Sequence, residues 1–159
     1  MGSRTGDISA MKKRRSLSAA KKAAWSWLSK CVRYSHATDG LHAACVTCGK
    51  VSKWTELDAG HYEPKTRSNA LFFCATNVAP QCTGCNRFRH GNLSEFARWM
   101  LREYGQGHLD RLADMRSMVM KWKVADYEEM IIHYKSMFAW MEQQRADGIT
   151  GRLELVPWQ

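Results

Sequence analysis

The sequence predicts a mostly helical α+β protein in which a small, cysteine-clamped core is flanked by helices. Three observations lead to this fold class. Two C-x-x-C pairs lie far apart in the middle of the chain, residues 43–91 show little helical periodicity and many turn-forming residues, and the segments on either side repeat apolar residues at helical spacing. With 159 residues, the chain fits one domain with a short arm at either end.

Charge is concentrated at the N-terminus. Residues 1–35 hold nine Lys and Arg against one acid, whereas the remaining 124 residues hold fifteen against fourteen. Residues 1–15 are therefore expected to form a disordered basic arm, of which the first ten residues have the composition of a vector-derived tag. A basic arm on a neutral body favours contact with a polyanion. The alternative is a solvated tail without a partner.

An N-terminal helical segment is expected over residues 16–42, ending near the Asp39-Gly40 turn. Its apolar residues recur at helical spacing: Leu17, Trp25, Leu28 and Val32. A core segment, residues 43–105, should hold strands at Val51–Trp54 and Asp58–Tyr62 and a loop at Pro64–Asn69. A helix should follow. Asn92 caps its start, Glu95 completes a capping box, and Gly105 ends it.

Residues 106–147 are predicted to form two further helices, over about 107–118 and from near Asp126, and residues 148–159 a short extended tail. The last helix carries an apolar stripe that could be core or a dimer surface: Tyr127, Met130, Ile131, Tyr134, Met137, Phe138 and Met141. No apolar run approaches the ~18 residues of a membrane span. The chain has no secretory signal, so a cytoplasmic location and no membrane partner are expected.

Four of the six cysteines predict a structural zinc site: Cys45, Cys48, Cys82 and Cys85. Each C-x-x-C turn supplies two sulfurs of a tetrahedral site, and four thiolates leave no open position for hydrolytic chemistry. The pairs are separated by 33 residues, longer than the spacer of a simple zinc ribbon. Cys31 and Cys74 are left over and are expected to be buried free thiols.

The segment that the zinc would clamp contains a second group of polar residues that suit phosphodiester hydrolysis: Asp58, His61, Asn77, Asn86 and His90. Histidine can serve as a general base near neutral pH, and oxygen and imidazole ligands suit a hard cation such as Mg²⁺ or Mn²⁺. Each residue alone has an ordinary structural explanation, such as a hydrogen-bonded strand histidine or a turn asparagine.

The order of these motifs resembles the NinG (Rap) recombination proteins of lambdoid phages over about residues 25–140. The similarity lies in Cys45–Gly49, Trp54, Asp58–Tyr62, Asn77, Gln81-Cys82, Cys85-Asn86 and Gly91–Leu93. This resemblance implies a structure-specific endonuclease that acts on branched DNA, including Holliday junctions and D-loops.

The arrangement is also similar to the ββα-metal, HNH-like fold of phage T4 endonuclease VII. That resemblance implies His61 as general base, Asn77 as the residue that orients the histidine or its loop, and Asn86 as a ligand of the catalytic Mg²⁺ or Mn²⁺, with Asp58 and His90 as further ligands. Gly60 occupies the position before the base that is a metal ligand in many such nucleases. On a regular strand Asp58 shares a face with Gly60, opposite His61, so it can reach the cation only if the strand bulges at Gly60.

Phosphate contacts are expected from ten basic residues of the arm and of the predicted site: Lys12, Lys13, Arg14, Arg15, Lys21, Lys22, Lys65, Arg67, Arg87 and Arg89. Symmetric cutting of a junction requires two active sites, so a homodimer is expected. Two other classes of protein fit the sequence: a zinc-stabilised DNA-binding protein without catalysis, and a zinc-centred protein–protein adaptor.

Overall fold

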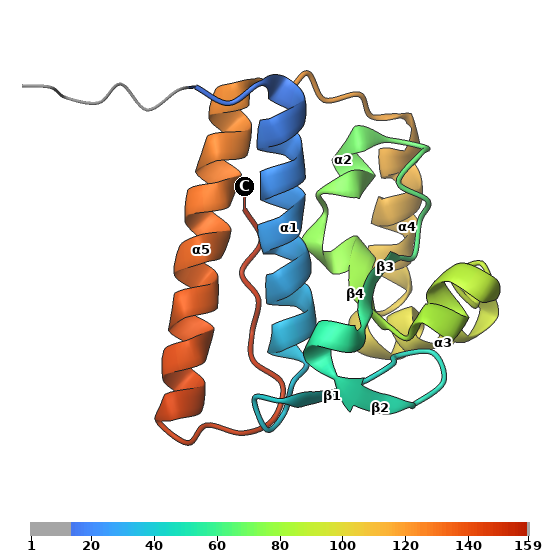
Figure 1. The fold of residues 1–159 in the computed structure, drawn as a ribbon. Coiled ribbons are helices and arrows are strands. Elements are labelled where there is room, and N and C mark those ends of the chain that lie inside the picture. The colour runs from blue at the N-terminus through green and yellow to red at the C-terminus, as the bar shows by residue number, and fades with distance from the viewer. Residues whose placement is uncertain (1–13, 159) are drawn as a thin grey trace, which may run out of the picture.

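The computed structural model describes residues 14–158. Two long helices, α1 (Leu17–Ser35) and α5 (Val124–Ala146), run side by side in the same direction. Two small sheets and the shorter helices lie on the other side of α1 from α5 (Figure 1). The prediction of a mostly helical α+β fold is confirmed.

The interface between α1 and α5 forms the larger hydrophobic core. Ser16 begins α1, because its hydroxyl accepts a hydrogen bond from the backbone N–H of Ala19 at 3.2 Å. Small residues of α1 let the two helices approach closely, and the buried residues of both helices include Ala20, Ala24, Leu28, Cys31, Tyr127, Met130, Ile131, Tyr134 and Met141. The apolar stripe of the last helix is therefore core, not a dimer surface.

The strands form two separate antiparallel pairs. Strand β1 (His42–Ala44) pairs with β2 (Val51–Lys53), and β3 (Asp58–His61) pairs with β4 (Val78–Gln81). The strands predicted near positions 51 and 58 are present, whereas β1 and β4 were not predicted. Register in the second pair is unbroken from Asp58 opposite Gln81 to His61 opposite Val78. The strand therefore has no bulge at Gly60.

Short helical elements fill the connections. A 3-10 turn, η1 (Trp54–Glu56), joins β2 to β3, while α2 (Asn69–Phe72) and η2 (Ala75–Asn77) lie between β3 and β4. A π-helical turn, η3 (Gly84–Phe88), follows β4. Next come α3 (Leu93–Tyr104), α4 (Gln106–Asp114) and a 3-10 turn, η4 (Met115–Ser117).

Asn92 precedes α3 as predicted, but its side chain does not cap the helix. Its backbone has a φ of 48°, and its amide nitrogen lies 3.6 Å from Cys85 Sγ. Glu95 pairs with Arg98 instead of closing a capping box. The predicted capping box is therefore wrong, because the cysteine cluster next to the helix takes the Asn92 side chain.

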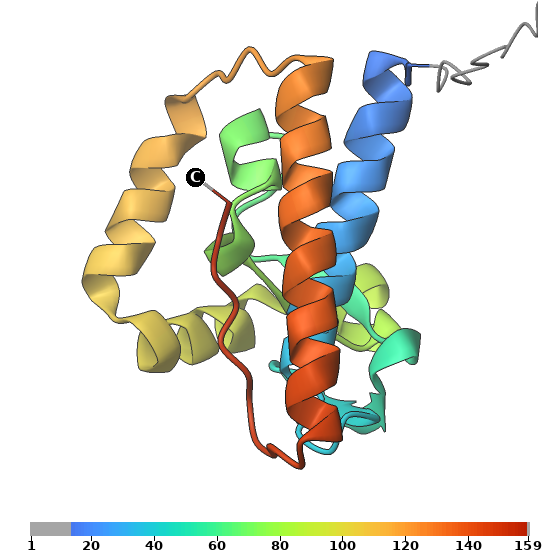
Figure 2. The ribbon, with the colours of Figure 1, turned by 90° about the vertical axis from the view of Figure 1, so that its left-hand side faces the viewer.

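The C-terminal segment returns as an extended chain along the α1–α5 pair, as Figure 2 shows. The backbone N–H of Leu153 donates to the carbonyl of Ser35 at 2.9 Å, and that of Trp158 donates to the Tyr134 hydroxyl at 3.2 Å. Leu153 is buried in the larger core. The tail is extended as predicted, and it contributes to the core.

Candidate metal centres and active site

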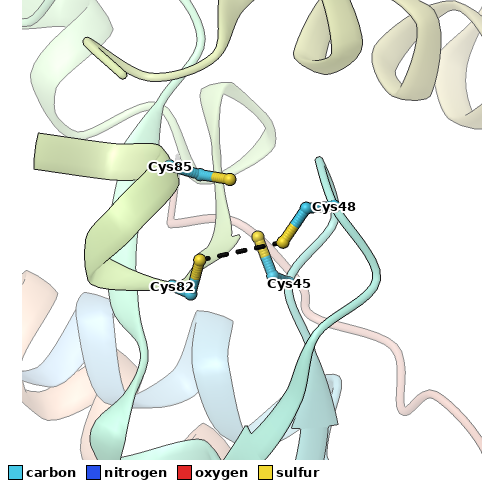
Figure 3. A group of neighbouring side chains, drawn as sticks. All are labelled: Cys45, Cys48, Cys82 and Cys85. Carbon is cyan, nitrogen blue, oxygen red and sulfur yellow. Dashed lines mark hydrogen bonds between the residues drawn. The ribbon is translucent and has the colours of Figure 1, made fainter. Parts of the chain in front are cut away.

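Four cysteine side chains converge at one end of the sheets. Cys45 and Cys48 lie on the turn between β1 and β2, whereas Cys82 follows β4 and Cys85 lies in η3 (Figure 3). All four sulfur atoms lie within 4.8 Å of one another, and Cys48 Sγ is 3.8 Å from Cys82 Sγ. A tetrahedral zinc with Zn–S bonds of about 2.3 Å places its sulfurs about 3.8 Å apart. The four cysteines therefore fit a structural metal such as zinc.

Neighbouring groups hold the two cysteine turns in place. The Thr47 hydroxyl lies 3.2 Å from Cys45 Sγ. The backbone N–H of Val46 donates to the carbonyl of Pro80 at 3.0 Å and so joins the first turn to β4. Contacts of this kind orient metal ligands. Of the two remaining cysteines, Cys31 is a buried free thiol as expected, and Cys74 is only half-buried.

Asp58 and Asn86 lie side by side although the sequence separates them by 28 positions. The Asn86 amide nitrogen donates to Asp58 Oδ2 at 3.0 Å, and Arg87 donates to both carboxylate oxygens at 3.0 and 2.9 Å. Burial raises the pKa of Asp58, but the hydrogen bonds from Arg87 and Asn86 outweigh it and leave the pKa below its usual value. Asp58 is thus an ionised carboxylate directly beside the second cysteine turn.

Gly60 explains how Asp58 reaches Asn86 without a bulge. Residues 58 and 60 share a face of β3 because side chains alternate along a strand. A Cβ atom at Gly60 would lie 3.2 Å from Asn86 Oδ1, so Asn86 covers this face. The missing side chain leaves room for Asn86 to extend to Asp58.

His61 ends β3 on the opposite face. Its ring stacks on Trp25 of α1, with centroids 4.9 Å apart, and its Nε2 lies 3.0 Å from the carbonyl oxygen of Phe72. A carbonyl only accepts, so Nε2 carries the proton and Nδ1 is the basic nitrogen. Burial lowers the pKa of His61 to about 4, so the ring is neutral at pH 7. This hydrogen bond and the stack fix both tautomer and orientation.

Asn77 holds the loop that follows His61. It is fully buried, its Oδ1 accepts from the backbone N–H of Glu63 at 2.8 Å, and its Nδ2 donates to the carbonyls of Glu63 and Leu71 at 3.0 and 3.1 Å. Leu71 precedes Phe72, whose carbonyl contacts His61. Asn77 therefore holds the loop and the segment that supplies the Phe72 carbonyl.

His90 lies beyond the helical turn that holds Asn86. The helical turn ends at Phe88, and His90 has a φ of 50°. The two residues do not share a helical face, because the backbone has already left the helical conformation. The His90 ring is exposed.

The predicted basic residues occupy several surfaces. Lys21 of α1 and Lys65 of the loop after β3 lie 4.9 and 5.7 Å from the centre of the Phe72 ring, next to His61. Arg15 pairs with Glu128 of α5. The exposed members are Arg14, Arg15, Lys22, Lys65, Arg67, Arg87 and Arg89. Lys12 and Lys13 lie outside the described residues.

Three residues of this region were not predicted: Trp25, Gln81 and Phe88. Trp25 was assigned to the helix core, and only the fold brings it to His61. Gln81 is fully buried between Thr47 of the first cysteine turn and Gly60 of β3. Phe88 is 80% exposed. Its position between Arg87 and Arg89 in the sequence is the signal that could have identified it.

The fold and site define a small α+β protein in which four cysteines that can hold a metal lie beside the Asp58–Asn86 pair, with His61 on the opposite face of the same strand. A family model described as "Bacteriophage Lambda NinG protein" matches residues 6–144, and the chain belongs to this family. Similar relatives are Protein ninG of Escherichia phage 933W and of Escherichia phage lambda, which are 24% and 23% identical over 103 residues. Those 103 residues are 65% of this chain and 50% of each relative.

Protein ninG of Salmonella phage P22 is 29% identical over 68 residues, which are 43% of this chain and 33% of that relative. The chain thus spans about half the length, or less, of the curated relatives it matches. No solved structure matches the chain. Within residues 14–158, the structure contains no helix that is long and apolar enough to cross a bilayer.

Proposed function

We propose that this protein is a metal-dependent endonuclease that cuts branched DNA recombination intermediates such as Holliday junctions and D-loops. The observation that carries the proposal is the hydrogen bond of 3.0 Å between Asn86 and Asp58 next to the four cysteines. Asp58 begins strand β3, and the same strand ends in His61, whose ring is neutral and held by the Phe72 carbonyl. The order of β3, β4 and η3 along the chain resembles the strand–strand–helix order of the ββα-metal fold and supports the proposal.

Asp58 and Asn86 are the proposed holders of a catalytic Mg²⁺ or Mn²⁺. An ionised carboxylate and an amide oxygen are ligands that hard cations prefer. Such a cation supplies Lewis-acid stabilisation of the charge that develops on the phosphate. Arg87 now occupies the outer side of the Asp58 carboxylate, and because its side chain is exposed it can move to a DNA phosphate. His90 stays a prediction as a further ligand.

His61 is the proposed general base. With its Nε2 proton donated to Phe72, it accepts the proton of the attacking water at Nδ1. Burial keeps the ring unprotonated at neutral pH, so Nδ1 is free to accept a proton. Asn77 positions the loop that supplies the Phe72 carbonyl.

The branched substrate is proposed from membership in the NinG family and from the surface around His61. Lys21 and Lys65 flank the histidine and suit phosphate contacts, and Phe88 and Arg89, which follow Asn86 in the chain, are exposed and can also contact DNA. Two active sites are needed to resolve a four-way junction symmetrically, so the active form is proposed to be a homodimer.

The test is cleavage of an end-labelled four-way junction and a matched linear duplex with Mg²⁺, Mn²⁺ or EDTA. Wild type is compared with His61→Ala and with His42→Ala, which removes an exposed histidine of β1. We expect cation-dependent junction cutting by wild type and His42→Ala, and a loss of at least 100-fold in His61→Ala, the usual contribution of a general base. Zinc content and junction binding should be unchanged in all three proteins.

Two other outcomes would reject the proposal. Junction binding without cutting under every cation would make the protein a zinc-stabilised DNA-binding protein. Salt-insensitive or absent DNA binding would favour a zinc-centred protein–protein adaptor.

A further inference from the structure

Two side-chain amides meet at the gap left by Gly60. A Cβ atom at this position would lie 2.8 Å from Gln81 Cδ and 3.2 Å from Asn86 Oδ1, and Gln81 Oε1 would be closer still. Real Cβ atoms essentially never come within 3.0 Å of another heavy atom. Gly60 is therefore required here by the close approach of Gln81, and it places the Gln81 and Asn86 side chains next to each other.

The orientation of Gln81 is fixed. Its Nε2 donates to the carbonyl of Gly91 at 2.7 Å and to the Thr47 hydroxyl at 3.3 Å. A carbonyl cannot donate, so turning the Gln81 amide over would place two acceptors against each other. Gln81 Oε1 must then face Gly60 and Asn86. It is buried and has no hydrogen-bond partner in the part of the chain that the structure describes.

A buried acceptor without a partner is destabilising and calls for an explanation. Asn86 offers one. With its Nδ2 donating to Asp58, it turns its own oxygen toward Gly60, on the same side as Gln81 Oε1. In this orientation the Asn86 nitrogen faces the Asp58 carboxylate and donates to it. A cation bound by Asp58 and Asn86 would need the Asn86 oxygen on that side instead.

We propose that Gln81 is a positioning residue that holds Asn86 in its cation-binding orientation. Half a turn of the Asn86 amide brings Oδ1 to the Asp58 side and Nδ2 to Gln81 Oε1. The orphaned acceptor then gains a donor, and Asn86 and Asp58 both present oxygen. This inference rests on the proposed cation site at Asp58 and Asn86.

The test measures Mn²⁺ affinity by electron paramagnetic resonance of the zinc-loaded protein. Wild type is compared with Gln81→Met, Asp58→Ala and Gln106→Met, in which an exposed glutamine of α4 is replaced as a matched control. Loss of a group that orients a metal ligand typically weakens metal binding 10–100-fold. We expect Gln81→Met to lose at least tenfold in Mn²⁺ affinity with unchanged zinc content, and Gln106→Met to bind as wild type.

A second measurement uses wild type alone and does not depend on the folding of any variant. In NMR spectra, the nuclear Overhauser effect between the Asn86 side-chain amide protons and the Gly60 α-protons should strengthen when Mg²⁺ is added. Unchanged Mn²⁺ affinity in Gln81→Met, or no Mg²⁺-dependent strengthening, would overturn the role of Gln81 alone. If wild type binds no Mn²⁺, or binds it equally well in Asp58→Ala, the cation site itself is overturned and the role of Gln81 with it.

Discussion

Asn77 shows how one buried amide fixes the shape of a functional loop. Its three hydrogen bonds all go to backbone groups of residues 63 and 71, on either side of the loop between β3 and α2. The resemblance to the ββα-metal fold implied that Asn77 orients the histidine or its loop, and the contacts found here are with the loop.

Replacing Asn77 with Ala should lower the free energy of unfolding by about 3 kcal/mol, because it leaves buried backbone groups without partners. Urea unfolding at pH 7 measures the change. Gln143→Ala removes an exposed amide of α5 and should change stability by less than about 0.5 kcal/mol. Equal effects of the two substitutions would contradict the role assigned to Asn77.

At the scale of elements, the cysteine centre joins turns that have little regular structure of their own. Strands β1 and β2 have three residues each, too few for a stable isolated hairpin. A metal bound by the four cysteines would therefore stabilise the whole segment from β1 to η3.

The exchange Cys48→Ser should abolish stoichiometric zinc binding and expose residues 42–91 to proteolysis, while α1 and α5 keep most of the helical circular-dichroism signal. Zinc content is measured by atomic absorption and the cut sites by mass spectrometry. Cys74→Ser is the matched control, because Cys74 lies outside the cluster. Protection of residues 42–91 in the zinc-free variant would show that the metal does not hold the segment.

The helical turn η3 also explains why Phe88 is exposed. The side chain is 80% exposed at the end of η3, two residues after Asn86. Aromatic side chains near a basic surface stack on unpaired bases, with contributions of about 1–3 kcal/mol.

Phe88→Ala should therefore weaken junction binding by about tenfold relative to duplex binding, with no loss of thermal stability. Fluorescence anisotropy with both DNAs measures the ratio. Leu93→Ala, which also removes an exposed apolar side chain, should leave the ratio unchanged. If the affinities for junction and duplex fall equally, Phe88 contributes to DNA binding in general and does not recognise unpaired bases.

The sequence was informative where local spacing decides the structure. C-x-x-C spacing predicted the four cysteines, and apolar periodicity predicted α1, α3 and α5. Strand β4 was missed because all four of its residues are buried and one is proline, so it shows neither alternation nor a full set of backbone donors. The role proposed for Gln81 could not be predicted, since it depends on contacts among β3, η3 and Gly91 that exist only in the fold.

At the scale of the whole molecule, two enclosed histidines make stability depend on pH. Burial, aided by the charge of Arg152, lowers the pKa of His36 to about 3, and burial lowers that of His61 to about 4. Both values lie below the unfolded value of about 6.5. The unfolded chain therefore binds more protons below pH 6.5, and stability should fall as the pH drops from 6.5 toward 4.

His36→Gln should remove part of this dependence. Between pH 7 and pH 5 the variant should lose about 2 kcal/mol less unfolding free energy than wild type, because about 1.5 pH units separate pH 5 from the unfolded pKa. Urea unfolding at both pH values measures this, with the exposed His90→Gln as control. An identical loss in His36→Gln and wild type would mean that His36 is not held neutral by the fold.

The net charge of +9 acts over the whole molecule, and its effect on DNA binding can be measured through salt. If roughly five phosphates are contacted, the logarithm of the binding constant should fall with the logarithm of salt concentration with a slope of about −4 to −5. Lys21 and Lys65 flank His61 from two different elements.

Replacing both lysines with Ala should make that slope less negative by about 2, one unit per lost phosphate contact. The matched control replaces Lys121 and Lys135, two exposed lysines, and changes the net charge equally. If both double variants change the slope alike, net charge alone governs binding. If only the Lys21 and Lys65 variant does, DNA crosses the molecule at the face where His61 lies.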